Sequence, residues 1–371
     1  MPKAIKQKNC LIISASNIQN TRIRLSLFNY LKDKFDRLSF CGDSIVEGVA
    51  NQIEWKGAYN RKGQIFEVVI FFRLVLLLIK HKPTHIISFA PKVNIYCGLL
   101  TRMFNIKHTA VISGLGSYVA NITKRGNLLN KLFKLSLSSA DLVLTMNEFN
   151  YQFCLNTLGK ESVRRIPSEG LQTDINLSVK QTCNTTKRIL YLSRIISEKG
   201  IFLLIDAFRN VHETYPDTEL IIAGEMSLTE ENGEKSLFIE KVKSSGINYN
   251  GEVSEQLKQE LLNQADIVVL ASMYGEGLPM ILLEAQLYQS IIITTNVPGC
   301  SDAVSPYMQQ FYCDYSVESL EAKLVEAINL SPISSKQLTD SASLWVKQNH
   351  DINCVNSVYN AYFVEKSFYS I

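Results

Sequence analysis

The second half of the chain alternates short apolar runs with longer segments whose apolar residues recur at helical spacing. Residues 199–215 and 254–265 show the helical spacing. The shorter runs are rich in Ile, Val and Leu without strict alternation, which is typical of strands buried on both faces. Strand, helix and strand in this order predict βαβ units and a parallel sheet. The five runs are RILYLSR (188–194), ELIIAGE (219–225), INYNG (247–251), DIVVLAS (266–272) and SIIITTN (290–296).

The first half shows the same alternation less clearly. A polar stretch at residues 179–188 precedes a fresh strand, so we expect one domain over residues 1–180 and a second over 181–350. We assign residues 351–371 to a C-terminal helix that completes the first domain. The predicted fold class is α/β, with two doubly wound Rossmann-like domains facing a cleft, where open sheets bind ligands at the carboxyl ends of their strands. The first-half runs are CLIISAS (10–16), HIISFA (85–90), HTAVISG (108–114) and DLVLTMN (141–147).

Two glutamates bracket one of the most apolar stretches, YGEGLPMILLEA at residues 274–285. Glu276 falls in the loop after a predicted strand, and Pro279 suits the first position of a helix. Glu284 follows on that helix among apolar neighbours, so we expect it to be buried. A buried carboxylate is paired or serves a ligand. The pattern therefore allows either a structural ion pair or an acceptor for vicinal hydroxyls, as acidic residues are for ribose.

Two cations lie near the end of the strand at residues 188–194. The segment SRIISEKG places Arg194 at the strand end, Lys199 at a helix start and Ser197 where an N-cap is expected. Two cations beside a helix N-terminus suit a diphosphate. Arg and Lys are also common on solvated loops, so this segment by itself is compatible with both interpretations.

Taken in order, the second-half segments resemble the nucleotide-sugar domain of family-four retaining glycosyltransferases, which have the GT-B fold. The Arg/Lys pair and the two glutamates, with seven residues between them, fall at the places expected for that family. The first half is similar through residues 88–118 and 140–147. The most similar subgroup is the bacterial enzymes that extend lipid-linked glycans. The matching segments are SRIISEKGIFLLIDAF, NYNGEV, ADIVVLAS, YGEGLPMILLEAQ and TTNVPGCSDAV.

The resemblance implies a role for each matching residue. The catalytic residues would be Arg194 and Lys199, which hold the diphosphate, and Glu276, which contacts the donor sugar. The expected donor is a UDP-sugar. The other donor-binding residues would be Glu284 for the ribose hydroxyls, Gly277 and Leu278 for backbone N–H groups beside the sugar, Asn250, Gly251 and Glu252 for the base pocket, and Gly114 and Gly116 for a first-domain loop at the cleft.

Three segments depart from the family pattern. The loop after the first strand reads SASN at residues 14–17, where the family often has a glycine pair. Ser113 precedes the Gly-Leu-Gly where many members have a nearby histidine, and His108 begins the strand instead, so we assign no catalytic histidine in the first domain. The linker IPSEGLQTD keeps Gly170 but lacks the usual Asn-Gly-Val-Asp form. The acceptor side and any acid/base residue therefore stay unassigned.

Composition narrows the choice of cofactor and compartment. The five histidines and eight scattered cysteines show no metal-ligand spacing, and the sequence has no Asp-x-Asp motif. Arg194, Lys199 and a helix N-terminus would instead stabilise the departing nucleoside diphosphate. We therefore expect a metal-independent enzyme without a cofactor, whose co-substrate is the nucleotide-sugar. The lack of a recognisable secretion signal and of a C-x-x-C pair indicates reduced thiols in a cytoplasm.

Charge is divided between the two halves. Residues 1–180 carry 25 Lys and Arg against 11 Asp and Glu, a net +14, and the rest carry 13 against 24, a net −11. From Val68 to Ala140 ten Lys or Arg occur and no acidic residue. The first half is therefore either a solvated basic surface or a surface that meets an anionic partner. No nucleic-acid module is recognisable, which argues against nucleic acid as that partner.

An anionic membrane and a polyprenyl-diphosphate-linked glycan acceptor both fit the basic half, and the resemblance implies such an acceptor. Polybasic surface contributes ~1 kcal/mol per Lys or Arg near anionic lipid. The apolar segment at residues 67–82 is interrupted by Arg73 and too short for a span, so we expect a buried or interfacial helix. We expect a cytoplasmic protein, peripheral at the inner face of the cell membrane, with membrane-facing residues Lys124, Arg125, Lys131 and Lys134.

The predicted function is that of a retaining glycosyltransferase. It would move a hexose or N-acetylhexosamine from a nucleotide diphosphate sugar to a lipid-linked glycan, in bacterial polysaccharide or glycoprotein glycan synthesis. Two alternatives stay open: another GT-B enzyme such as a nucleotide-sugar epimerase, and a non-catalytic nucleotide-binding module. An epimerase needs no lipid acceptor, and a binding module shows no turnover. A Rossmann dehydrogenase is disfavoured because no G-x-G-x-x-G follows the first predicted strand.

Overall fold

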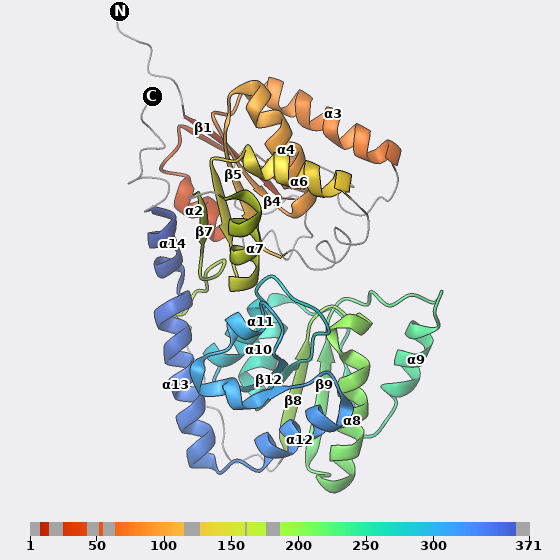
Figure 1. Ribbon diagram of the computed structural model, residues 1–371. Coiled ribbons are helices and arrows are strands. Elements are labelled where there is room, and N and C mark those ends of the chain that lie inside the picture. Colours follow the sequence, from red (N-terminus) through yellow and green to blue (C-terminus); the bar gives the residue numbers. More distant parts are fainter. Residues whose placement is uncertain are drawn as a thin grey trace, which may run out of the picture. The chain divides into compact units, whose positions relative to one another are not determined.

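Two parallel sheets, each in its own unit, organise the chain (Figure 1). One unit comprises Met1–Gly170 with Ile352–Ile371, and the other comprises Leu171–Asp351. The α/β class predicted from the apolar runs is confirmed. The computed structural model describes residues 8–14, 25–42, 52–54, 64–114, 127–159, 162–175 and 186–360.

The described residues of the first unit form seven parallel strands: β1 (Asn9–Ser14), β2 (Arg37–Gly42), β3 (Gln52–Glu54), β4 (His85–Phe89), β5 (Lys107–Ile112), β6 (Leu142–Thr145) and β7 (Val163–Arg165). Their order in the sheet is β3-β2-β1-β4-β5-β6-β7. The direction of winding reverses between β1 and β4, as in a doubly wound fold. Every residue of β4 is buried, as its nearly continuous apolar run predicts.

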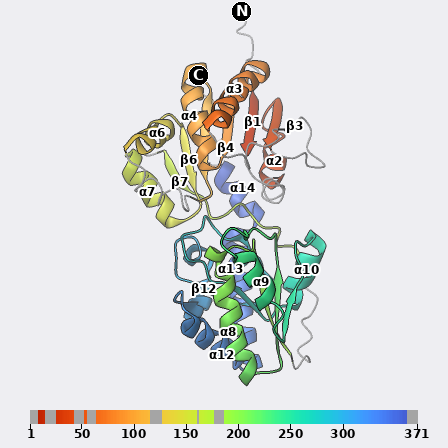
Figure 2. The same cartoon turned by 90° about the vertical axis from the view of Figure 1, so that its right-hand side faces the viewer.

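The helices of the first unit are α2 (Leu25–Leu31), α3 (Gln64–His81), α4 (Pro91–Phe104), α6 (Asn127–Ser138), α7 (Glu148–Leu158) and α14 (Ile352–Asn360). Leu74 and Leu78 of α3 join Val93 of α4 in one buried apolar cluster, and the two helices lie side by side in Figure 2. Gly98 lets α4 approach α6 closely, since a Cβ there would lie 2.2 Å from the Ser136 carbonyl oxygen. No helix in the described ranges is both long enough and apolar enough to cross a membrane.

In the second unit, the part of the chain that the structure describes forms six parallel strands: β8 (Lys187–Leu192), β9 (Thr218–Ala223), β10 (Ile247–Tyr249), β11 (Ile267–Leu270), β12 (Ile291–Thr295) and β13 (Tyr312–Cys313). Their order is β10-β9-β8-β11-β12-β13. All five apolar runs predicted as strands form strands here. The short strand β13 was not predicted.

The helices of the second unit are α8 (Ile201–Thr214), α9 (Glu234–Lys241), α10 (Glu255–Gln264), α11 (Met280–Leu287), α12 (Val317–Ile328) and α13 (Pro332–His350), with short 3₁₀ turns η1 (Ser197–Lys199), η2 (Ser301–Ala303) and η3 (Pro306–Phe311). Helix α8 buries Leu204, Ala207, Phe208 and Val211 of the apolar face expected from its spacing, and Leu203 of that face is half-buried. It packs against α12, and α11 packs against α13 (Figure 1).

The chain passes between the units twice, at residues 170–171 and at residues 351–352. The two passages are joined within the second unit. Leu171 N–H donates to the His350 carbonyl at 2.9 Å, and Thr173 Oγ1 donates to Asp351 Oδ2 at 2.5 Å. The boundary predicted from the sequence, between residues 180 and 181, lies outside the described part of the chain.

Candidate functional site

Lys199 and Glu276, which lie far apart in the sequence, form an ion pair at the carboxyl edge of the second sheet. Lys199 ends η1 after β8, and Glu276 lies in the loop between β11 and α11. Their Nζ and Oε1 atoms are 3.3 Å apart, and the side chains are only 13% and 14% exposed. Water and salt screen such a pair less than a fully exposed pair. The structure therefore brings together two of the three residues predicted as catalytic.

Glu276 is held through both its side chain and its backbone. Ser272 Oγ donates a hydrogen bond of 2.9 Å to Oε1, the same oxygen that faces Lys199. The Glu276 N–H donates to the Pro298 carbonyl at 2.8 Å. Gly299 has φ +85°, and a Cβ there would lie 2.4 Å from the Glu276 carbonyl oxygen. Because only glycine fits at 299 without displacing the loop, these contacts fix the position of the carboxylate.

The two loops meet because a glycine follows η1. Gly200 has φ +75°, and a Cβ there would lie 2.1 Å from the carbonyl oxygen of Ala271, just after β11. Met273 N–H donates to the Glu198 carbonyl at 2.8 Å. These backbone contacts join the loop after β8 to the loop after β11. They place the ammonium of Lys199 within reach of the opposite carboxylate.

Ser197 does not cap the following long helix, contrary to the prediction. Gly200 is the N-cap residue of α8, and Ser197 instead opens the 3₁₀ turn. The Ser197 hydroxyl donates to Glu234 Oε1 at 2.5 Å, in the first turn of α9. The left-handed conformation of Gly200 separates η1 from α8, which is why the serine cannot reach the first N–H groups of α8.

Arg194, the third residue predicted as catalytic, is exposed in the loop after β8. Tyr191 Oη donates to its carbonyl oxygen at 2.9 Å. Burial, together with the negative charge of Glu276, raises the pKa of Tyr191, so the hydroxyl stays protonated and keeps this bond. The backbone of Arg194 is thereby fixed. Its guanidinium makes no hydrogen bond or ion pair with any described residue, which leaves its donors available to a ligand.

Glu284 has a cationic partner that the sequence did not reveal. Its Oε1 on α11 lies 2.6 Å from Nζ of Lys258 on α10, and the two side chains are 17% and 21% exposed. The same Nζ lies 3.3 Å from Glu255 Oε1. Burial acts to lower the pKa of Lys258, but the two carboxylates raise it and the net shift is upward, so the lysine is protonated at neutral pH. Of the two interpretations left open for Glu284, the ion pair is present, and ribose binding stays a prediction.

The residues predicted for the base pocket follow β10 at the same edge of the sheet. Asn250 N–H donates to the Ile222 carbonyl at 2.9 Å, and the Gly251 carbonyl accepts from Gly224 N–H at 2.7 Å. Gly251 has φ +66°, with no atom within 4 Å of the position that a Cβ would take. The side chains of Asn250 and Glu252 are exposed. The loop is thus anchored by its backbone and open at its surface.

Four more predicted donor residues are glycines or backbone donors. Gly277 and Leu278 lie between Glu276 and the N-terminus of α11, and Leu278 packs against the core of the second unit. Gly114 follows β5 in the first unit and is half-buried. Gly116 lies outside the described residues. The roles of these residues stay predictions.

The predicted membrane-facing residues belong to the first unit. Lys131 and Lys134 are exposed on α6. Lys124 and Arg125 lie in residues 115–126, outside the described part of the chain. Two of the four cations are therefore located on one helix.

His108, for which no catalytic role was predicted, is a core residue of the first unit. It is fully buried, and its Nε2 lies 2.7 Å from Ser88 Oγ, which in turn donates to Asn94 Oδ1 at 2.7 Å. This network assigns the ring proton to Nε2 and leaves Nδ1 without a hydrogen-bond partner among the described residues. Burial lowers the pKa of His108 to about 4, so the ring is neutral at physiological pH.

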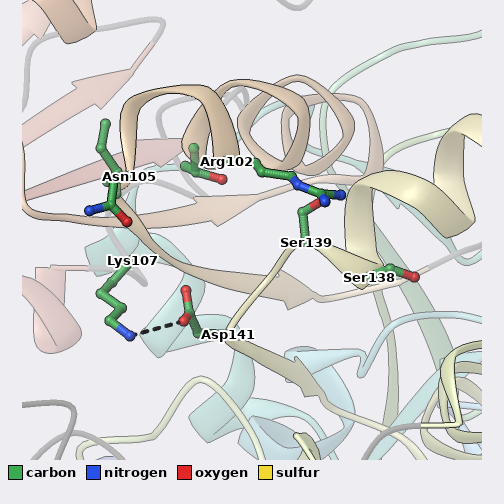
Figure 3. A pocket seen from close by; sticks show the side chains of 8 residues that line it. Arg102, Asn105, Lys107, Ser138, Ser139 and Asp141 are labelled. Carbon is green, nitrogen blue, oxygen red and sulfur yellow. Dashed lines mark hydrogen bonds and ion pairs between the residues drawn. The ribbon is translucent and has the colours of Figure 1, made fainter.

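The first unit also has a polar hollow of about 420 Å³ at the ends of α4 and α6 (Figure 3). Lys107 and Asp141 form an ion pair of 3.3 Å in its wall. Lys107 is the first residue of β5 and Asp141 directly precedes β6. The hollow therefore lies at the amino edge of the sheet, whereas open α/β sheets bind ligands at the carboxyl edge. We assign no ligand there. Elsewhere in the described ranges, no group of three or more His, Cys, Asp or Glu side chains is placed to hold a metal ion.

Comparison with protein families adds a match over the second unit. Residues 174–345 match the family model described as glycosyl transferases group 1. The chain is 28% identical, over 252 residues, to the N,N'-diacetylbacillosaminyl-diphospho-undecaprenol alpha-1,3-N-acetylgalactosaminyltransferase of Campylobacter jejuni, a match that covers 63% of this chain and 65% of the relative. It is 24% identical, over 246 residues, to the capsular polysaccharide biosynthesis glycosyltransferase CapM of Staphylococcus aureus, covering 62% and 63%. The chain therefore spans slightly less than two thirds of each relative.

Comparison with solved structures extends the likeness to nearly the whole chain. The crystal structure of Anabaena Alr3699/HepE in complex with UDP and glucose superposes with a TM-score of 0.76 at 13% identity. The superposition covers 96% of this chain and 100% of that one. At this identity the likeness concerns the fold, and it includes both units.

Proposed function

We propose that this protein transfers a sugar from a nucleotide diphosphate sugar to a lipid-linked glycan, because residues 174–345 match the glycosyl transferases group 1 model and the chain has the predicted GT-B fold. The transferred group is a hexose or an N-acetylhexosamine, the donor is a UDP-sugar, and the anomeric configuration is retained. The enzyme class, a glycosyltransferase, follows from the family. The donor, the acceptor and the stereochemistry are the parts that we propose.

The observation that carries this proposal is the meeting of Lys199 and Glu276 at a carboxyl edge that also presents Arg194. A departing nucleoside diphosphate gains negative charge as its bond to the sugar breaks. Cations fixed before the reaction stabilise that charge without reorganising. In this role Arg194 and Lys199 contact the diphosphate, and Glu276 orients Lys199 while it accepts hydrogen bonds from the sugar hydroxyls.

The neighbouring loops supply the rest of the donor site. The carboxylate of Glu284 accepts from the ribose hydroxyls, as acidic residues do at nucleotide sites in related α/β folds. The loop of Asn250, Gly251 and Glu252 contacts the base. The N–H groups of Gly277 and Leu278 contact the sugar. The open space beside Gly251 supports a planar group at that position.

The bond changes balance without a metal ion or cofactor. The acceptor hydroxyl oxygen bonds to the anomeric carbon, and the bond from that carbon to the β-phosphate oxygen breaks. The hydroxyl proton passes to an oxygen of the departing diphosphate, which leaves with the bonding electron pair. We expect activity to survive dialysis against EDTA. Full loss of activity with EDTA, restored by Mg²⁺ or Mn²⁺, would contradict the proposal that side chains supply the positive charge.

The membrane is the proposed location of the acceptor, and α3 supports this. Four large apolar side chains, at intervals of three, four and three residues, are 41%, 60%, 66% and 53% exposed: Val69, Phe72, Leu76 and Ile79. This spacing places them on one face of the helix, opposite the face that meets the core. A helix that is apolar on both its core and its solvent side is suited to lie in a lipid interface.

Exposed cations on α3 and α6 suit the same partner. Arg73 and Lys80 are exposed on α3, and Lys131 and Lys134 are exposed on α6. Anionic lipid and a polyprenyl diphosphate carry the complementary charge. The Campylobacter relative is named for a diphospho-undecaprenol substrate, which has this chemistry. We therefore place this protein at the inner face of the cell membrane.

The test is transfer with defined substrates. The purified protein is incubated with UDP- and GDP-sugars and a synthetic polyprenyl-diphosphate-linked glycan in anionic vesicles. The expected product is the glycan extended by one sugar, identified by mass spectrometry, with the donor's anomeric configuration by NMR. Conversion of the free nucleotide-sugar into an epimer, without transfer, would favour an epimerase. Nucleotide binding without turnover of any donor would favour a binding module.

A further inference from the structure

Lys258 forms an ion pair with Glu284, and none of the binding roles proposed for Glu284 explains why this lysine is present. The two residues lie on different helices, α10 and α11, and their Nζ and Oε1 atoms are 2.6 Å apart. Each side chain is about four-fifths buried. An ammonium beside a carboxylate at this distance forms a charge-assisted hydrogen bond, which restricts the carboxylate to a small range of orientations.

Lys258 is itself fixed before it reaches Glu284. Ser254 caps α10, with its side chain accepting from the Leu257 N–H at 3.2 Å, and this defines the first turn of the helix. Within that turn Glu255 Oε1 lies 3.3 Å from the Lys258 ammonium. The lysine is therefore bracketed by a carboxylate on its own helix and by a carboxylate on the next one.

The contact leaves acceptor capacity on Glu284. A carboxylate has two oxygens with about four lone-pair positions. Lys258 donates to Oε1, and no hydrogen bond to Oε2 occurs within the described part of the chain. An oriented carboxylate with one oxygen paired and one available suits a pair of vicinal hydroxyls. A carboxylate without the lysine would have to lose rotamer freedom when the ligand arrives.

Packing alone does not require this ion pair. Leu261 and Leu262 of α10 and Leu282 and Leu283 of α11 are buried in the core of the second unit. Those leucines hold the helices in place through apolar burial. A partly exposed ion pair adds little to stability in comparison. The position of Lys258 is thus better explained by the carboxylate that it orients than by the fold.

We infer that Lys258 is a positioning residue that orients Glu284 for the ribose of the nucleotide before the donor binds. This inference rests on the proposed function, because it takes Glu284 as the ribose-binding carboxylate. Lys258 acts through Glu284 and makes no contact with the reacting atoms. Its removal therefore weakens nucleotide binding and leaves the chemical step nearly unchanged.

A double-mutant cycle with UDP as the probe tests this. Calorimetric dissociation constants are measured for wild type, Lys258→Met, Glu284→Gln and the double variant. We expect Lys258→Met to weaken UDP binding about five- to tenfold, the range that corresponds to ordering one flexible side chain. The double variant should bind within about twofold of Glu284→Gln, because a lysine that acts through the carboxylate has no effect once the carboxylate is gone. Lys258→Arg should restore most of the affinity.

A second probe separates ribose recognition from general electrostatics. Wild type should bind UDP more tightly than 2′-deoxy-UDP, and Lys258→Met should lose part of that preference. The steady-state KM for the donor should rise while kcat changes less than twofold. Lys336→Met is the matched control, since Lys336 pairs with Asp340 at 2.9 Å on the exposed surface of α13. Circular dichroism confirms that each variant is folded, and Lys258→Gln serves as an independent removal of the ammonium.

Three outcomes would overturn the inference. Unchanged UDP affinity in both Lys258→Met and Lys258→Gln means that the lysine orients nothing. If the loss of UDP affinity in the double variant equals the product of the losses in the two single variants, Lys258 contacts the ligand directly. A rise of UDP affinity on removal means that Lys258 competes with the ribose. In each of these cases the wild type still binds UDP and Glu284→Gln still weakens UDP binding, so the proposed function stands. Wild type that binds neither UDP nor GDP overturns the proposed donor, and this inference with it.

Discussion

The two units share one sheet plan and differ in the connections at its carboxyl edge. In each sheet the winding reverses beside the unit's first strand, between β1 and β4 and between β8 and β11. The connection from β4 to α4 is the single residue Ala90, whereas the connection from β11 to α11 runs over residues 271–279. Only the longer connection has room for Ser272 and Glu276. The length of the loop where the winding reverses, and not the sheet, decides which unit carries the ion pair of Lys199 and Glu276.

The surfaces of the units differ in the same way. The first unit exposes an apolar stripe on α3 and cations on α3 and α6. The second unit holds two partly buried ion pairs, Lys199 with Glu276 and Lys258 with Glu284, and exposes Arg194. Exposed cations and apolar side chains suit a broad lipid surface, whereas partly buried ion pairs suit a small polar ligand. The following five experiments test this contrast, from the largest expected effect to the smallest.

The largest effect is expected from the loops of the second unit. Arg194→Ala and Glu276→Gln should each lower kcat about 10²- to 10³-fold, because each removes or disorders positive charge at the leaving diphosphate. Arg102→Ala changes an exposed cation of the first unit and should leave donor turnover unchanged. Steady-state kinetics with the preferred UDP-sugar measure both. Equal losses in all three variants would show that the catalytic charge is not confined to the second unit.

The next effect concerns the buried histidine of the first unit. The pKa of His108 is about 4 in the folded protein, against roughly 6.5 for an unperturbed histidine. As the pH falls, the unfolded chain therefore binds the proton first, so stability that is present above pH ~6.5 is lost between ~6.5 and ~4. The loss approaches about 3 kcal/mol per such histidine.

Urea unfolding at pH 7.5 and pH 5 measures this loss. His108→Gln should show a smaller drop between the two pH values than wild type, whatever its stability at pH 7.5. The glutamine keeps a polar side chain beside Ser88 but does not titrate. An identical drop in both proteins would mean that other groups cause the acid sensitivity.

The apolar stripe should decide the salt-resistant part of membrane binding. Phe72→Ser with Leu76→Ser should weaken binding to anionic vesicles at least about tenfold, because each side chain contributes about 1.5–3 kcal/mol when fully buried in an apolar environment. The loss should persist at 1 M salt, where the Debye length is only ~3 Å. The control is Ile333→Ser with Leu344→Ser, two side chains of the second unit with similar exposure, 72% and 55%.

The cations should decide the salt-sensitive part. Replacing Lys124, Arg125, Lys131 and Lys134 with Gln should weaken vesicle binding at 0.1 M salt and have little effect at 1 M. Nucleotide-sugar binding should be unchanged, because the residues proposed for it belong to the second unit. Co-sedimentation with neutral and anionic vesicles measures both. Self-association of the wild type through α3, with no binding to either vesicle, would identify the stripe as a contact between copies.

The smallest effect is expected at the two connections that follow the reversal of winding, from β4 to α4 and from β11 to α11. Ala90 has φ +77°, a region that non-glycine residues rarely adopt. Ala90→Gly should therefore raise the free energy of unfolding by about 1 kcal/mol. Ala271, the first residue after β11, is not among the described residues with positive φ. Ala271→Gly should lower the free energy by a similar amount, so thermal unfolding should shift in opposite directions. Shifts of the same sign would show that the short connection is not strained.

Much of the fold was predictable because the signals are local. Continuous Ile, Val and Leu runs identified β8 to β12 in the second unit and β1, β4, β5 and β6 in the first. The strands that were missed are β2, β3, β7 and β13, and none of them has that signal. Strand β3 and strand β7, at the two edges of the first sheet, span three residues each, and β7 contains Arg164 and Arg165. Edge strands tolerate charge and short length because one side faces no partner strand.

The sequence by itself determined which charged residues follow which strands. Arg194 and Lys199 come after β8 and Glu276 after β11 because each position is set by a strand end and a few loop residues. Because the carboxyl ends of parallel strands lie at the same edge of a sheet, these loops lie together at that edge. The same local pattern predicted that Glu284 lies on an apolar helix.

Only the tertiary structure decided what these carboxylates meet. Lys258 reaches Glu284 because α10 and α11 lie close together, and Ser272 reaches Glu276 because Gly200 and Gly299 let backbones approach. No periodicity connects residue 258 with residue 284. A 3.6-residue repeat fixes which face of a helix is apolar, whereas the distance between two side chains on different helices depends on the packing of everything between them.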